Sequence, residues 1–127
     1  MTGPQLTTEL RTLLADLLGT YRDSDLGPSA DRPAAGYGEL PASVTATGLE
    51  VHVDDEPELD VQAAYQHEVG IRRAWTVRLV AWDGTPAGAL SSAVGRVVAT
   101  YRTPAPVQLP EDPRLGIKRQ AAITVTD

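Results

Sequence analysis

The sequence predicts an α+β domain in which an antiparallel β-sheet of about four strands is covered on one face by two amphipathic helices. Residues 5–19 and 87–101 place apolar side chains at helical spacing. Between and after them, segments that alternate apolar and polar residues are joined by short polar turns, as in antiparallel hairpins. The chain has 127 residues, enough for one domain with its own core, so we expect a single domain over residues 1–127.

The first predicted helix depends on leucines that recur three and four residues apart: Leu6, Leu10, Leu13, Leu14, Leu17 and Leu18. Thr7 or Thr8 is the expected N-cap, and Gly19 is the expected end of the helix. Residues 23–41 are rich in proline and glycine, which predicts a long loop.

Three strand-like segments follow this loop. Val44 begins a short piece that Gly48 interrupts, and residues 49–53 then alternate apolar and polar side chains. Residues 54–58 form a polar turn, alternation returns over 61–65, and a second turn is expected at 67–70. Residues 71–82 are the strongest strand candidate, in which Trp75, Val77, Leu79 and Ala81 face one way. The remaining residues form no clean polar face, which is the pattern of a strand whose far end is buried on both sides.

The second predicted helix follows Asp83 and Gly84, with Thr85 as its expected N-cap and Pro86 in its first turn. Pro104 and Pro106 end it, and a proline-rich loop extends to residue 113. Apolar positions between residues 117 and 125 predict a closing strand.

Composition excludes several classes of function. The absence of cysteine excludes disulfides, thiolate metal sites and cysteine nucleophiles. A net charge of −6 argues against tight binding to a phosphate backbone. No apolar run approaches the ~20 residues of a membrane span, and no signal peptide is expected. We expect neither an enzyme nor a cofactor, because no catalytic motif is present.

Two features could still carry chemistry. His52 and His67 lie in or beside strands, and with Asp54 and Glu68 they could hold a metal ion, although exposed or partner-facing histidines fit the pattern better. The acidic residues Asp54, Asp55, Glu56, Glu58 and Asp60 lack the spacing of a calcium loop and suit a charged hairpin turn.

The two tryptophans should face opposite sides of the sheet, because Trp75 and Trp82 are an odd number of residues apart on one strand. One belongs in the core under the helices. The other lies on the second face, where either a neighbouring subunit or a loop would cover it.

The order of these elements resembles that of the tail terminator (tail completion) proteins of tailed bacteriophages and of related minor tail and neck proteins. The resemblance covers a leading helix (5–19), a proline and glycine loop, a hairpin leading into the strand 73–83, a helix (87–101) and a closing stretch (115–125). It extends over nearly the whole chain and depends on element order rather than on a diagnostic motif.

This resemblance implies a structural virion protein without catalytic residues or cofactor, assembled in the host cytoplasm. Members form homo-oligomeric rings, usually hexamers, that cap the tail tube, meet the head–neck connector proteins and let DNA pass without binding it. The expected contacts with a neighbouring subunit or the tube are Asp54, Asp55, Glu56, Glu58, Gln66, His67, Glu68 and Trp82. The expected acidic lining of the channel is Asp54, Asp55, Glu58 and Asp60. A head–tail adaptor, another minor tail protein, a stand-alone module with a small-ligand pocket between the sheet and the helices, and a small metal enzyme remain alternatives.

Overall fold

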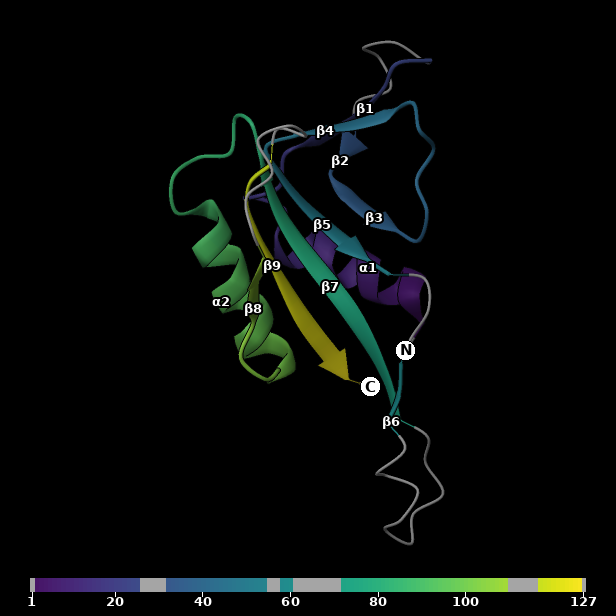
Figure 1. Ribbon diagram of the computed structural model, residues 1–127, viewed down its shortest axis with the longest axis vertical. Coiled ribbons are helices and arrows are strands. Elements are labelled where there is room, and N and C mark those ends of the chain that lie inside the picture. Colours follow the sequence, from purple (N-terminus) through teal and green to yellow (C-terminus); the bar gives the residue numbers. More distant parts are fainter. Residues whose placement is uncertain (1, 26–31, 55–57, 61–71, 110–116, 127) are drawn as a thin grey trace, which may run out of the picture.

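A computed structural model describes residues 2–25, 32–54, 58–60, 72–109 and 117–126, and it confirms the α+β class (Figure 1). The helices are α1 (Gly3–Leu13) and α2 (Ala89–Tyr101). The strands, in chain order, are β1 (Thr20–Asp23), β2 (Arg32–Pro33), β3 (Ala35–Tyr37), β4 (Val44–Thr47), β5 (Leu49–Val53), β6 (Glu58–Asp60), β7 (Arg72–Trp82), β8 (Val107–Leu109) and β9 (Ile117–Thr126).

The described strands form two sheets, so the expected single sheet of about four strands is only approximate. Six strands make the larger sheet, in the order β3-β5-β7-β9-β8, with β6 also paired to β7. The smaller sheet has the order β2-β1-β4 and lies at one end of the larger one (Figure 1). Pairing is antiparallel as expected, except that β3 runs parallel to β5. The two segments predicted as loops hold strands that the pattern did not reveal, β2 and β3 in one and β8 in the other.

Helix α1 begins two residues earlier than expected and ends six residues before Gly19. Its N-cap is Thr2, whose side chain accepts a hydrogen bond from the Gln5 N–H, and Gln5 returns a bond to the Thr2 N–H. The predicted caps, Thr7 and Thr8, instead lie inside the helix and donate to carbonyl oxygens four residues earlier.

Helix α2 also begins differently from the prediction. Its N-cap is Gly88, in the left-handed conformation with φ of 81°, which glycine adopts without strain. Thr85 does not cap the helix, because its hydroxyl donates to the Trp82 carbonyl oxygen at 2.6 Å.

The core lies between the two helices and one face of the larger sheet. Helix α1 packs on β3 and β5, and α2 packs on β7 and β9. Trp75 is 2% exposed there, as expected for the inward tryptophan. The other core side chains alternate along the strands or follow the helical stripes: Leu6, Leu10, Leu14, Leu49, Val51, Val53, Val77, Leu79, Ala93, Val97, Ile123 and Val125.

Strand β5 is buried on both faces, because all five of its residues are buried. Its apolar residues face the helices. Its polar residues, Glu50 and His52, face the other side, which carries no helix; we call this side the helix-free face. The charged and aromatic side chains described next lie on this face.

Candidate functional site

Glu50 is the centre of a hydrogen-bonded group on the helix-free face. Its side chain is only 8% exposed. The Tyr21 hydroxyl donates to Oε2, and the Trp82 indole donates to Oε1 at 2.9 Å. Both oxygens therefore accept bonds from neutral donors, an arrangement that suits the ionised carboxylate.

His52, Arg78 and Asp54 form a second group beside Glu50. His52 Nε2 donates to the Gly38 carbonyl oxygen at 2.6 Å, and Arg78 Nη2 donates to His52 Nδ1 at 3.3 Å. These bonds suit a neutral imidazole with its proton on Nε2. Asp54 Oδ1 lies 3.8 Å from Arg78 Nε, within ion-pair distance, and 3.4 Å from His52 Nδ1, a contact that is no ion pair when the imidazole is neutral.

Strand register brings these side chains together. His52 on β5 lies directly opposite Arg78 on β7, and Glu50 lies opposite Val80. Trp82 is two residues further along β7, on the same face and diagonal to Glu50. The Glu50 group thus draws on β5, β7 and the smaller sheet, which supplies Tyr21 from β1.

Gly36 on β3 makes room for the Tyr21 hydroxyl. A Cβ atom at this position would lie 2.6 Å from the hydroxyl oxygen, closer than side-chain atoms normally approach. Gly36 pairs with His52 in the parallel ladder, so the gap lies directly beside the site. A glycine here is therefore a condition for the Tyr21–Glu50 bond.

Burial is the main cause that raises the pKa of Tyr21 above its ordinary value, and the charge of Glu50 and its hydrogen bond add to this. Tyr21 is 1% exposed, so its phenolate would be both desolvated and next to a carboxylate. The tyrosine therefore acts as a hydrogen-bond donor rather than as a base.

A cavity of about 360 Å³ opens beside these groups. Its polar lining is Glu50, His52, Arg78, Trp82 and Gln120, and Gly38, Leu40 and Val80 complete it. Its volume lies near the lower end of the range for small-molecule sites. The cavity combines a buried carboxylate, a guanidinium and an aromatic ring, so it can bind a small polar or charged group.

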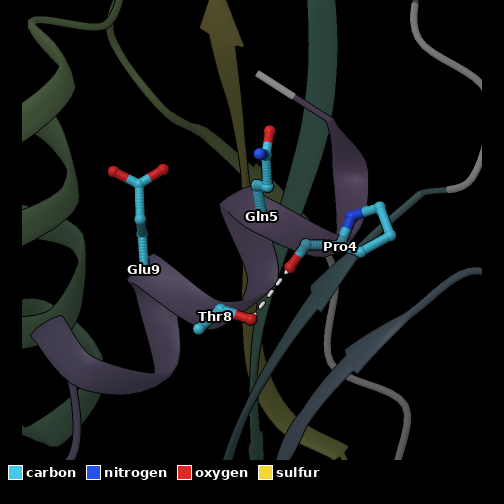
Figure 2. A pocket seen from close by; sticks show the side chains of 4 residues that line it. All are labelled: Pro4, Gln5, Thr8 and Glu9. Atoms are coloured by element: carbon cyan, nitrogen blue, oxygen red, sulfur yellow. Dashed lines mark hydrogen bonds between the residues drawn. The ribbon is translucent and has the colours of Figure 1, made fainter.

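A larger, more open hollow of about 570 Å³ lies over the first turns of α1 (Figure 2). Pro4, Gln5, Thr8 and Glu9 line it. The Thr8 hydroxyl is already bonded to the Pro4 carbonyl oxygen at 3.0 Å, and Gln5 completes the helix cap. Two of its three polar side chains thus serve the helix itself and the third, Glu9, is exposed, so the cavity on the helix-free face is the better candidate site.

Only part of the predicted contact and channel set falls within the described residues. Trp82 lies on the helix-free face as expected, half-buried and bonded to Glu50. Asp54 also lies there and is engaged by His52 and Arg78. Glu58 and Asp60 belong to β6, which is a strand where a turn was expected at Glu58. Asp55, Glu56, Gln66, His67 and Glu68 lie outside the described residues.

Of the two alternatives expected for His52, exposed or partner-facing, the exposed one is wrong, because the ring is buried and both of its nitrogens have partners. A role in facing a partner stays a prediction. His67, its proposed partner in a metal site, lies outside the described residues. Within the described part of the chain, no group of three or more histidine, aspartate or glutamate side chains is placed to hold a metal ion.

The sequence did not reveal Tyr21, Glu50 and Arg78 as site residues. Glu50 alternates with apolar neighbours along the strand, and this pattern is the same whether its face of the sheet is exposed to solvent or buried. Tyr21 lies between a predicted helix and a predicted loop, where no strand was expected. The tryptophan spacing was the one useful pattern, since it placed Trp82 on the face where Glu50 also lies.

No family model matches the chain, and no curated protein or solved structure matches it. Among the described residues, neither helix has the length and apolar character needed to cross a membrane.

Proposed function

We propose that this protein is a structural component of the bacteriophage tail, a terminator ring that caps the tail tube, joins it to the head–neck complex and lets DNA pass. The observation that carries the proposal is the order of the elements. A leading helix, strands, the long strand β7, α2 and the closing strand β9 follow one another in the order on which the resemblance depends. A head–tail adaptor or another minor tail protein is the nearest alternative.

The distribution of side chains is consistent with a protein that assembles. Both helices lie on one face of the larger sheet, which leaves the helix-free face to polar and aromatic side chains. At the β8 edge of that sheet, Val107 is 60% exposed, the only large hydrophobic side chain so exposed among the described residues. An edge strand with an exposed apolar side chain favours pairing with another chain.

Size-exclusion chromatography with light scattering tests the ring directly, and negative-stain images of the same fractions show its symmetry. The expected result is a closed ring, or a monomer that assembles when tail tubes are added. A protein that stays monomeric and never binds tubes would exclude the terminator function. A Val107→Lys variant should assemble less well, whereas Thr124→Lys, at an exposed position of β9, is the control for added charge.

The acidic channel is tested separately. Charge reversal at Glu58 and Asp60 should make assembled rings retain DNA, because like charge no longer repels the duplex. Reversal of Asp25 and Glu39, two exposed acidic residues elsewhere, is the matched control. Equal retention by both variants would show that Glu58 and Asp60 do not line the channel.

One observation favours a second candidate, a stand-alone ligand-binding module. Such a module was expected to hold its ligand between the sheet and the helices, but that space is filled by the core. The cavity lies on the opposite face instead. A thermal-shift screen against metabolites distinguishes the two functions, because strong stabilisation by one compound favours a binding module.

A further inference from the structure

The cavity on the helix-free face holds a buried carboxylate, Glu50, that forms no ion pair among the described residues. Glu50 is more than nine-tenths buried, and its two hydrogen-bond donors, Tyr21 and Trp82, are neutral. The ion pairs formed by the described residues involve Asp54 and Asp16, and none of them includes Glu50. A buried carboxylate is normally paired with a cation, because hydrogen bonds from neutral groups only partly replace its hydration.

The other charged groups of the cavity do not supply the missing cation. Arg78 donates to His52, and its Nε lies 3.8 Å from Asp54 Oδ1 without a hydrogen bond, so its ion-pair partner among the described residues is Asp54 and not Glu50. Arg32 lies over the Tyr21 ring, 5.7 Å from its centroid, and forms no ion pair with Glu50 among the described residues. With a neutral imidazole at His52, two carboxylates stand against one guanidinium, and the site keeps a net negative charge located at Glu50. Each carboxylate oxygen still has acceptor capacity, since Oε2 accepts from Tyr21 and Oε1 from Trp82, and a carboxylate oxygen can accept two hydrogen bonds.

The shape of the cavity suits an organic cation. It has a volume of about 360 Å³, and the indole of Trp82 forms part of its wall next to the carboxylate. A guanidinium or ammonium group is attracted by an aromatic ring as well as by a carboxylate, and the attraction increases when the pair is desolvated. Leu40 and Val80 add apolar surface for a short alkyl stem.

We propose that this cavity binds a monovalent organic cation, a guanidinium or primary ammonium group, with Glu50 as its counter-ion and Trp82 as its aromatic wall. The inference does not depend on the ring function. The cation can come from a side chain of a second copy or from a free small molecule, and the chemistry of recognition is the same in both cases.

The two tryptophans make the test direct. The chain contains only Trp75 and Trp82, so a proton–nitrogen NMR spectrum has two indole signals, assigned with a Trp82→Phe variant. Titration with ethylguanidinium or butylammonium chloride, at constant ionic strength kept with NaCl, should shift the Trp82 signal saturably. Trp75 lies in the core and serves as the internal reference. Ethylurea, a neutral compound of the same size, should shift neither signal.

Two variants test whether the shift of the Trp82 signal depends on the Glu50 carboxylate. Glu50→Gln keeps the shape of the side chain and removes its charge, so it should weaken cation binding at least about tenfold. Glu9→Gln removes one exposed charge on α1 and should leave binding unchanged. If Glu50→Gln fails to fold, the comparison of ethylguanidinium with ethylurea on the wild type still decides the question.

Sedimentation velocity distinguishes the two sources of the cation. If a second copy supplies it, the wild type associates, Glu50→Gln loses that association, and added ethylguanidinium competes with it. If a free molecule supplies it, ethylguanidinium binds without any change in mass. The proposal is overturned if no saturable Trp82 shift occurs and Glu50→Gln sediments as the wild type does. It is also overturned if the Trp82 signal shifts saturably only in an Arg78→Met variant. That result would show that Arg78 already neutralises Glu50 in the wild type.

Discussion

Replacement of Tyr21 by phenylalanine removes one hydroxyl and leaves Glu50 Oε2 without its donor. Both side chains are buried, at 1% and 8% exposure, so water does not easily replace the lost bond. A hydrogen bond to a charged group contributes about 1.5–3 kcal/mol. For a domain of this size, 1 kcal/mol corresponds to roughly 4 °C in Tm. We therefore expect Tyr21→Phe to lower Tm by roughly 6–12 °C without changing the fold.

Urea unfolding of a double-mutant cycle of Tyr21→Phe and Glu50→Gln tests whether the hydroxyl stabilises the protein through the carboxylate. Because the hydroxyl stabilises the protein through the carboxylate, Tyr21→Phe should be much less destabilising when Glu50→Gln is already present. Trp82→Ala is a poorer probe, since the indole is half-buried and its loss also removes packing. A Tyr21→Phe variant as stable as the wild type would show that the hydrogen bond from Tyr21 to Glu50 does not stabilise the protein. Effects of the two substitutions that simply add would show that the hydroxyl does not act through the carboxylate.

Four further substitutions test the scaffold. Gly19→Ala should destabilise the protein by about 3 kcal/mol or more, because its Cβ would lie 1.8 Å from a backbone carbonyl oxygen of β4. Gly95→Ala, in open space on α2, should instead stabilise it by about 0.5–1 kcal/mol, and urea unfolding of both variants checks this. Asp16 accepts a hydrogen bond from Arg96, which lowers the pKa of the carboxyl below its ordinary value. The pair therefore stabilises the fold while the carboxylate is ionised, and this stabilisation is lost as the pH falls through the lowered pKa. Asp16→Asn should lower Tm at pH 7, and the difference from the wild type should shrink in acid. Thr2→Ala should lower the free energy of unfolding by about 1 kcal/mol through loss of the capping box, as circular dichroism melts can measure.

Periodicity predicted the parts of the fold that are buried on one side only. The leucine stripe of α1 and the apolar positions of β9 have one buried and one exposed face, and the alternation in β7 correctly placed Trp75, Val77 and Leu79 in the core. Helix α1 nevertheless ends at Leu13, before the last leucines of the stripe, and Val80 is buried on the other face of β7. Helix starts were less predictable. Thr2 rather than Thr7 begins α1, because a cap depends on the hydrogen bonds it forms and not on its residue type alone.

The candidate site could not be predicted because its contacts join distant parts of the chain. Tyr21 reaches Glu50 from a strand of a second sheet, across a gap that exists only because residue 36 is glycine. The short strands β2, β3 and β8 have two or three residues each, too few for alternation to be recognised. Their pairing partners, not their own residues, make them strands.

The burial of β5 on both faces has a consequence for the folding of the chain. Side chains along a strand alternate, so a one-residue shift of β5 against β7 would exchange its two faces. The shifted strand would place Glu50 and His52 among the leucines under the helices, where an unpaired carboxylate is strongly unfavourable. The two polar residues of β5 therefore make a shifted pairing with β7 unfavourable, whereas a strand of apolar residues alone would tolerate it. In this sense Glu50 selects one alignment of the sheet before any partner binds.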